Sequence, residues 1–170
     1  MPVLLEHFKP MLDPTSLTVV SPDMGRVRVA DIWSDKLGAP LAIIHKRRDP
    51  RVHNQVEVRE IVGEVAGRTC LIVDDMIDTG RTIAKAAEAL KAHGATRVIV
   101  AATHAVFSPP AIDMLQSEFI DSVVVTDTLP IPEEKRFPTL TVLPIAPLIA
   151  RAISAVFNDG SVTSMFDGAA

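Results

Sequence analysis

Residues 70–82 constrain the fold of this chain more than any other segment, because an apolar run passes directly into two adjacent acids and a short loop that carries hydroxyls and a glycine. The run at residues 69–73 is too uniformly apolar for a strand with one solvated face, so it predicts a buried strand of a parallel sheet. Residues 83–93 predict a helix. The loop is therefore expected where a parallel strand leads into a helix N-terminus.

The side chains of this loop suit a sugar phosphate. Backbone N–H groups at a helix N-terminus, together with the positive end of the helix dipole, can hold a phosphate. Thr79 and Thr82 would add hydroxyls, and Gly80 would let the main chain approach the ligand closely. Asp74 and Asp75 cannot hold a phosphate, but their carboxylates can accept hydrogen bonds from two vicinal hydroxyls or bind Mg²⁺. The segment predicts a site for ribose 5-phosphate.

A simpler interpretation of the same loop is helix capping. Asp78 and Thr79 are both residue types that cap helix N-termini well. On this reading the polar residues would stabilise the helix and bind nothing.

Strand and helix signals alternate along the whole chain, which favours an α/β fold with a parallel sheet and helices on its faces. Residues 60–65 and 69–73 read as neighbouring strands, whereas residues 46–57 are polar, basic and interrupted by Pro50, and predict a mobile loop. The other predicted strands are residues 17–20, 41–44, 97–102, 122–125 and 139–143, and the other predicted helices are residues 26–37, 110–116 and 146–157.

Length and composition narrow the class of protein. With 170 residues, 48% hydrophobic and 22% charged, the chain is long enough for one domain over residues 1–170. It has no apolar run near the ~20 residues that span a bilayer, and no visible signal peptide. The single Cys70 favours a reducing compartment, so we expect a cytoplasmic protein. The net charge of -4 argues against a nucleic-acid partner, although Lys46, Arg47, Arg48 and Arg51 form a local basic cluster.

The order of residues at 70–82 resembles the phosphoribosyl pyrophosphate binding motif of the type I phosphoribosyltransferase superfamily. From about Pro2 to Phe166 the chain also resembles the C-terminal half of the ribose-phosphate diphosphokinase (phosphoribosyl pyrophosphate synthetase) family. Four further segments carry this resemblance, at residues 21–30 (SPDMGRVRVA), 44–48 (IHKRR), 103–108 (THAVFS) and 126–137 (TDTLPIPEEKRF).

The resemblance implies a phosphoribosyltransferase-like, three-layer α/β/α domain. It also implies an enzyme, a transferase of nucleotide biosynthesis that moves the diphosphoryl group of Mg-ATP to the 1-hydroxyl of ribose 5-phosphate. Because the family enzyme is about twice as long, most of its ATP site is expected outside this chain. The family further implies a homo-oligomer, while the hydropathy and net charge given above predict no membrane or nucleic-acid partner. Two alternatives remain, a non-catalytic regulatory subunit of a synthetase and a base phosphoribosyltransferase.

Residue roles follow from the resemblance. Lys46 and Arg48 match a flexible catalytic loop whose cations stabilise charge on the phosphoryl groups. Asp23 matches an acid that helps to hold Mg²⁺. The simpler alternatives are a solvated basic loop and, for Asp23, a helix N-cap. His104 reads as a framework residue. The residues implied for ribose 5-phosphate are Arg48, Asp74, Asp75, Asp78, Thr79, Gly80, Arg81 and Thr82, of which Arg81 is atypical for this family.

Overall fold

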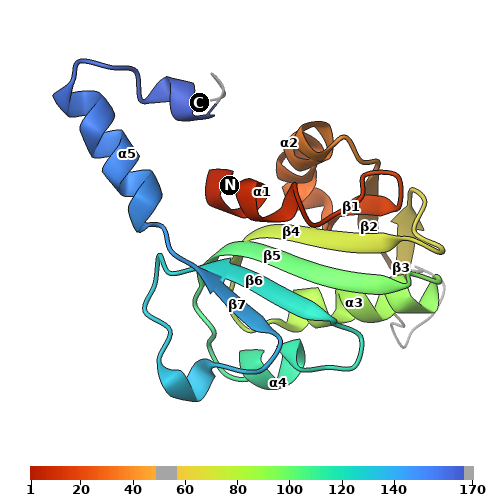
Figure 1. Ribbon diagram of the computed structural model, residues 1–170. Coiled ribbons are helices and arrows are strands. Elements are labelled where there is room, and N and C mark those ends of the chain that lie inside the picture. The colour runs from red at the N-terminus through yellow and green to blue at the C-terminus, as the bar shows by residue number, and fades with distance from the viewer. Residues whose placement is uncertain (49–56, 167–170) are drawn as a thin grey trace.

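The chain folds around a seven-stranded sheet in the order β3-β2-β1-β4-β5-β6-β7 (Figure 1). The computed structural model describes residues 1–48 and 57–166. Neighbouring strands are parallel except for the antiparallel pair of β2 and β3. The strands are β1 (Leu17–Ser21), β2 (Leu41–Arg48), β3 (Glu57–Val62), β4 (Thr69–Ile77), β5 (Arg97–Ala105), β6 (Ser122–Thr126) and β7 (Leu140–Leu143).

Helices cover both faces of this sheet, which confirms the predicted three-layer α/β/α class (Figure 1). In β4, Cys70 and Ile72 join the core beneath α3 and α4, whereas Leu71 and Val73 join the core beneath α1 and α2. This alternation is the period-two pattern of a strand that is buried on both faces. The helices are α1 (Pro2–Phe8), α2 (Val27–Leu37), α3 (Arg81–Ala92), α4 (Ala111–Leu115) and α5 (Ala146–Phe157), with 3-10 helices η1 (Met24–Arg26), η2 (Glu133–Lys135) and η3 (Thr163–Phe166).

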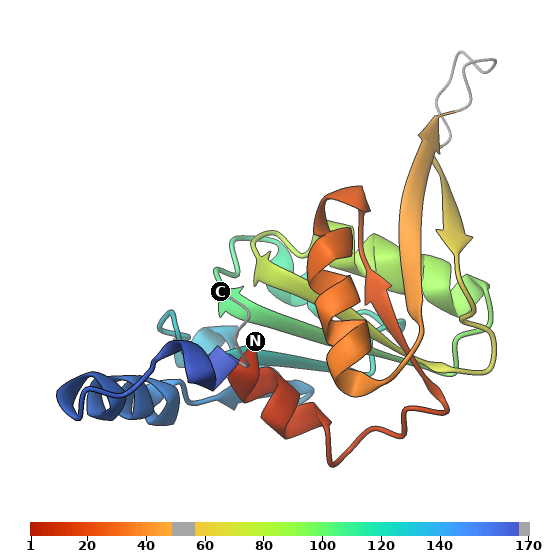
Figure 2. The same ribbon diagram turned by 90° about the horizontal axis from the view of Figure 1, so that it is seen from above.

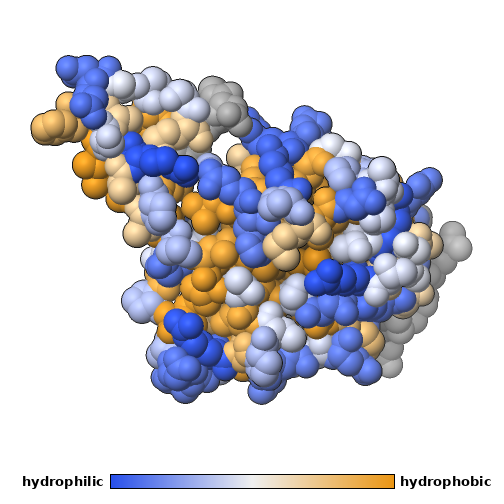
Figure 3. All heavy atoms as spheres, viewed as in Figure 1, coloured by the Kyte–Doolittle hydropathy of each residue, from blue (hydrophilic) through white to orange (hydrophobic). Residues whose placement is uncertain are grey.

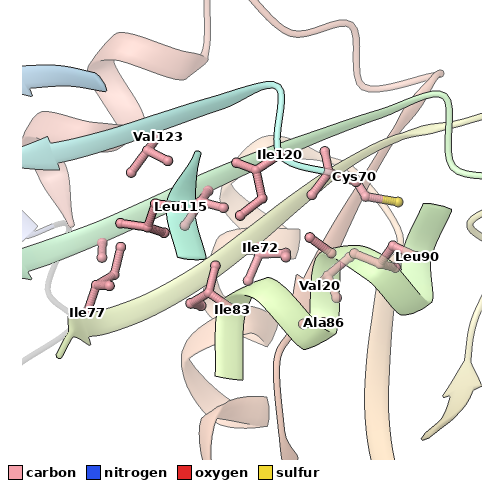
Figure 4. Packing of buried hydrophobic residues seen from close by; sticks show 14 of the residues in the cluster. Val20, Cys70, Ile72, Ile77, Ile83, Ala86, Leu90, Leu115, Ile120 and Val123 are labelled. Carbon is pink, nitrogen blue, oxygen red and sulfur yellow. The ribbon is translucent and has the colours of Figure 1, made fainter. Parts of the chain in front are cut away.

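Helix α3 is fixed against the sheet by an apolar stripe. Ile83, Ala86 and Leu90 recur at helical spacing and are almost fully buried. Figure 4 shows them facing side chains of the sheet, including Ile72. Because this stripe starts in the first turn, it holds the N-terminus of α3 beside the end of β4.

The prediction that residues 60–65 and 69–73 are neighbouring strands was wrong. Strand β3 pairs with β2, in the register Ile43 to Val62, while β4 lies between β1 and β5. After β3 the chain turns at Gly63, whose φ of 119° favours glycine. A Cβ at Gly63 would also lie 2.8 Å from the Ala42 Cα. The absence of a Cβ therefore lets the chain leave β3 close beside Ala42 of β2.

The predicted loop at residues 46–57 was wrong at both of its ends. Lys46 to Arg48 continue β2, where Lys46 is the register partner of Arg59 and Arg48 that of Glu57. Residues 49–56, which include Arg51 of the basic cluster, lie outside the described residues. The hairpin of β2 and β3 extends past the rest of the sheet (Figure 2). A polar strand is tolerated there because the extension has no sheet neighbour beyond the hairpin.

Helix α1 was not predicted. Pro2 is its first residue, a position where the backbone N–H that proline lacks would have no intrahelical acceptor. Leu4, Leu5 and Phe8 of this helix are buried. The ring of Phe8 lies 6.2 Å from that of Trp33 in α2. The i, i+4 spacing of Leu4 and Phe8 was the available signal, but it spans too few residues to show periodicity.

Helix α5 agrees with its prediction but buries none of its residues. It leads away from the sheet, and hydrophobic residues are visible along it (Figures 1 and 3). Ile153 is 64% exposed and Phe157 is 86% exposed. The Arg151 guanidinium lies 3.2 Å from the Glu6 carboxylate of α1.

Across residues 1–48 and 57–166, no helix combines the length and the apolar character needed to cross a membrane.

Candidate functional site

An open cavity of about 300 Å³ lies where β4 gives way to α3. It contains every predicted ribose-phosphate residue whose side chain the structure describes. Two segments that are distant in sequence contribute to it, one that follows β1 and one that runs from the end of β4 into α3. This placement follows from the parallel order of β1 beside β4, because the carboxyl ends of parallel strands meet at one edge. The lining residues are Asp23, Arg26, Asp74, Asp75, Met76, Ile77, Asp78, Thr79, Gly80, Arg81, Thr82 and Ile83.

The two adjacent acids belong to β4 itself. The predicted strand ended at residue 73, but pairing with β5 continues through Met76, opposite His104, and Ile77, opposite Ala105. The side chain of Asp74 is 13% exposed and that of Asp75 is 39% exposed. The strand backbone therefore holds this acid pair, Asp74 and Asp75, more rigidly than the loop assumed from the sequence would.

Arg26, the last residue of η1, contacts both carboxylates. Its Nε lies 3.1 Å from Asp74 Oδ1, and its Nη2 lies 2.7 Å from Asp75 Oδ1. The second contact lacks hydrogen-bond geometry, so the buried Asp75 Oδ1 has no donor. A buried carboxylate oxygen without a donor is unfavourable. The acid pair therefore retains capacity to accept a hydrogen bond.

Burial raises the pKa of Asp74 to about 6. The backbone N–H of Asp75, 2.8 Å from Asp74 Oδ1, and the Arg26 guanidinium both favour the charged carboxylate and limit this rise. The neighbouring Asp75 carboxyl raises the pKa further. Asp74 is thus an ionised acceptor at pH 7 that loses its charge in mildly acidic solution.

No side chain caps α3, so the capping interpretation of the loop is not supported. The N-cap residue is Gly80, and neither Asp78 nor Thr79 donates or accepts a capping hydrogen bond there. The first-turn N–H groups of Arg81, Thr82 and Ile83 therefore have no intrahelical acceptor, and these three residues line the cavity. These groups form an arrangement that can bind an anion.

Gly80 has two structural reasons to be glycine. Its φ is 71°, in the left-handed region, and a Cβ there would lie 3.2 Å from the Cβ of Met114 and 3.3 Å from the carbonyl oxygen of Ala111 in α4. The sequence suggested close approach to a phosphate as the reason. The structure adds close packing between the loop and α4.

Asp23 lines the same cavity and caps η1. Its Oδ1 accepts a hydrogen bond from the Gly25 N–H at 2.8 Å, so the N-cap alternative is confirmed. The second carboxylate oxygen of Asp23 has no role in this cap. Within the described part of the chain, no three His, Cys, Asp or Glu side chains are grouped so that they could hold a metal ion.

The structure does not bring Lys46 and Arg48 into the described lining of the cavity. Their backbone forms the outer end of β2, and their side chains lie outside the described residues. His104 is half-buried, and its Nδ1 lies 2.9 Å from the Thr128 hydroxyl, which agrees with a framework role. Arg26 is the site residue that the sequence analysis missed, and its place three residues after Asp23 was the available signal.

Solved structures of known proteins share this fold. A phosphoribosylpyrophosphate synthetase from Mycobacterium smegmatis superposes with a TM-score of 0.78 and 51% identity, over 92% of this chain and 49% of that one. An adenine phosphoribosyltransferase superposes with a TM-score of 0.52 at 20% identity, over 72% of each chain, and that likeness concerns the fold alone. The fold is therefore that of the type I phosphoribosyltransferases.

Sequence comparison gives the family. The profile of the phosphoribosyl synthetase-associated domain matches residues 50–167, and the chain belongs to that family. The ribose-phosphate pyrophosphokinase of Streptomyces coelicolor is 59% identical over 98% of this chain, and that of Mycobacterium leprae is 57% identical over 99%. The chain spans about half the length of these curated relatives, 52% in both cases.

Proposed function

We propose that this chain is the ribose 5-phosphate-binding half of a ribose-phosphate diphosphokinase. The whole enzyme would transfer diphosphate from Mg-ATP to the 1-hydroxyl of ribose 5-phosphate and release AMP and phosphoribosyl pyrophosphate. One observation carries the proposal, namely that an acid pair and an uncapped helix N-terminus border the same cavity. These are the complementary partners of vicinal hydroxyls and of a phosphate.

In this proposal the phosphate lies at the start of α3. The free N–H groups of its first turn would donate to the phosphate oxygens, and the exposed Arg81 and Thr82 would add a cation and a hydroxyl. The hydroxyl of Thr79 and the main chain at Gly80 border the same space, as does Asp78. The remaining oxygens of Asp74 and Asp75 would accept the ribose hydroxyls. The 1-hydroxyl would then stay free for transfer.

Catalysis would depend on positioning and on charge. The 1-hydroxyl oxygen would bond to the β-phosphorus of ATP while the bond from that phosphorus to the AMP oxygen breaks. Lys46 and Arg48 would meet the negative charge that develops on the transferred group. Both residues lie on the hairpin of β2 and β3, which extends past the rest of the sheet.

The residues present fit a magnesium ion that is shared with the substrates. Mg²⁺ keeps several waters and commonly takes one or two carboxylates together with substrate phosphates. Asp23 offers one carboxylate oxygen outside its cap. When bound, Mg²⁺ would neutralise charge on the diphosphate, and Asp23 would contact it directly or through water.

The remaining expectations concern the whole protein. We propose that most of the ATP site lies outside this chain, that the protein is a cytoplasmic homo-oligomer, and that residues 1–170 form a single domain. No nucleic-acid or membrane partner is proposed. The exposed apolar face of α5 supports self-association, since such surface is unfavourable in water.

Isothermal titration calorimetry with matched ligands tests the proposal. Ribose 5-phosphate should bind more tightly than inorganic phosphate and than 2-deoxyribose 5-phosphate. The deoxy sugar lacks one donor to the acid pair, and a hydrogen bond to a charged group contributes about 1.5–3 kcal/mol, so its affinity should be at least ~10-fold weaker. Equal affinity for the two sugars would contradict the role of the acid pair, and no binding of either would contradict the proposal.

The affinity for ribose 5-phosphate should also fall as the pH falls through about 6. The pKa of Asp74 is raised to about 6, so its carboxylate is an acceptor above that pH and is progressively protonated below it. Between pH 7.5 and pH 5 the loss should be roughly tenfold larger for wild type than for Asp74→Asn. The phosphate of the ligand titrates equally in both titrations. Parallel pH profiles would contradict this role of Asp74.

A further inference from the structure

The guanidinium of Arg26 occupies the cation position between the two acids of the pair. It reaches Asp74 Oδ1 with Nε, at 3.1 Å, and Asp75 Oδ1 with Nη2, at 2.7 Å. Asp74 Oδ1 also accepts the Asp75 N–H at 2.8 Å. One oxygen of each carboxylate therefore faces the guanidinium, at Asp75 Oδ1 through charge alone because that contact lacks hydrogen-bond geometry, and the second oxygen of each carboxylate is left for a ligand.

The segment that carries Arg26 is fixed by its own hydrogen bonds. The hydroxyl of Ser21 donates to the Asp23 carbonyl at 2.7 Å, and the Asp23 carboxylate accepts from the Gly25 N–H at 2.8 Å. The turn between β1 and α2 therefore presents Arg26 to the end of β4. The conformation of this turn therefore favours the contact of Arg26 with the acid pair, and the Arg26 side chain is only 37% exposed there.

We propose that Arg26 is a specificity-determining residue of this site, because it keeps divalent cations off the acid pair and reserves the pair for sugar hydroxyls. The part concerning sugar rests on the function proposed above, whereas the part concerning cations does not. An acid pair alone can bind either Mg²⁺ or vicinal hydroxyls. Arg26 decides between these two ligands.

Charge and geometry both support this selection. Arginine stays protonated at all ordinary pH values, and a divalent ion between the same carboxylates would meet its positive charge at close range. Mg²⁺ also demands near-octahedral oxygen ligands, and two carboxylate oxygens are engaged with Arg26. Uncharged hydroxyl donors meet neither obstacle, because they need one free acceptor oxygen each.

Binding of Mn²⁺ in the absence of sugar phosphate tests the proposal, with the free ion measured by electron paramagnetic resonance. Arg26→Gln removes the charge but keeps most of the side chain, and it should bind Mn²⁺ on the order of tenfold more tightly than wild type. Arg26→Lys keeps the charge and should show no such gain. The double variant Arg26→Gln, Asp75→Asn should lose the gain, because the new ion would need the acid pair.

Three results would overturn the proposal. The first is an unchanged Mn²⁺ affinity in Arg26→Gln. The second is a gain that persists after Asp75→Asn, since the ion would then lie elsewhere. The third is weaker Mn²⁺ binding by Asp75→Asn than by wild type. This comparison needs no Arg26 variant, so it does not depend on whether such a variant folds. Calorimetry with ribose 5-phosphate on the same proteins reports separately on the proposed function.

Discussion

Replacing both members of the acid pair, by Asp74→Asn with Asp75→Asn, should weaken the binding of ribose 5-phosphate by ~100-fold or more. Each hydrogen bond from a sugar hydroxyl to a carboxylate contributes about 1.5–3 kcal/mol, so loss of both charges removes at least ~3 kcal/mol. The double variant should still fold, because Asn avoids the cost of a buried charge at position 74 and Arg26 is exposed enough to be solvated. Calorimetric titration measures the loss.

A second adjacent acid pair provides the matched control. Glu133 and Glu134 lie on η2, are exposed and do not line the cavity. Glu133→Gln with Glu134→Gln changes the net charge by the same amount and should leave the affinity within about twofold of wild type, because exposed charges at a distance are screened. If the two double variants bound ribose 5-phosphate equally well, the acid pair would have no role in binding.

The second large effect concerns Lys46. If its cation meets charge that develops only in the transition state, Lys46→Ala should lower kcat much more than it changes KM. Loss of one preorganised electrostatic partner lowers kcat by ~10²-fold or more. The measurement uses a chimera in which this chain replaces the matching half of the Streptomyces coelicolor ribose-phosphate pyrophosphokinase, 59% identical over the shared region.

Lys9→Ala is the control for this experiment, because Lys9 is an exposed cation at the end of α1 and does not line the cavity. Its kcat should equal that of the unmodified chimera. A kcat near the unmodified value for Lys46→Ala as well would identify the basic end of β2 as a solvated segment without a catalytic role.

The central strand and helix of the fold could be predicted from the sequence because their structure depends on which residues are apolar and at what spacing. The run at residues 69–73 is buried on both faces, and the helical spacing of Ile83, Ala86 and Leu90 predicts the buried stripe of α3. The acid pair and the following loop were also predicted, because both lie within one continuous segment between this strand and this helix.

What was missed depends on contacts between distant segments. In the sequence, Arg26 looks like an ordinary basic residue at the start of a helix. Its contact with Asp74 and Asp75 forms only because β1 and β4 are neighbours in the sheet. Likewise, β3 pairs with β2, a strand on the far side of residues 49–56, and the packing of Gly80 against α4 brings together residues more than 30 apart in sequence. Local patterns carry no signal for either contact.

Nuclear magnetic resonance tests most directly where ribose 5-phosphate binds. Titration of the ¹⁵N-labelled chain with this ligand should shift the backbone amides of residues 79–83 and of Asp75, because we propose that the phosphate lies at the start of α3 and the sugar at the acid pair. Amides of α5, which does not border the cavity, should stay unchanged. Unshifted amides of residues 79–83 at saturating ligand, or shifts clustered at another part of the molecule, would contradict the proposed binding site.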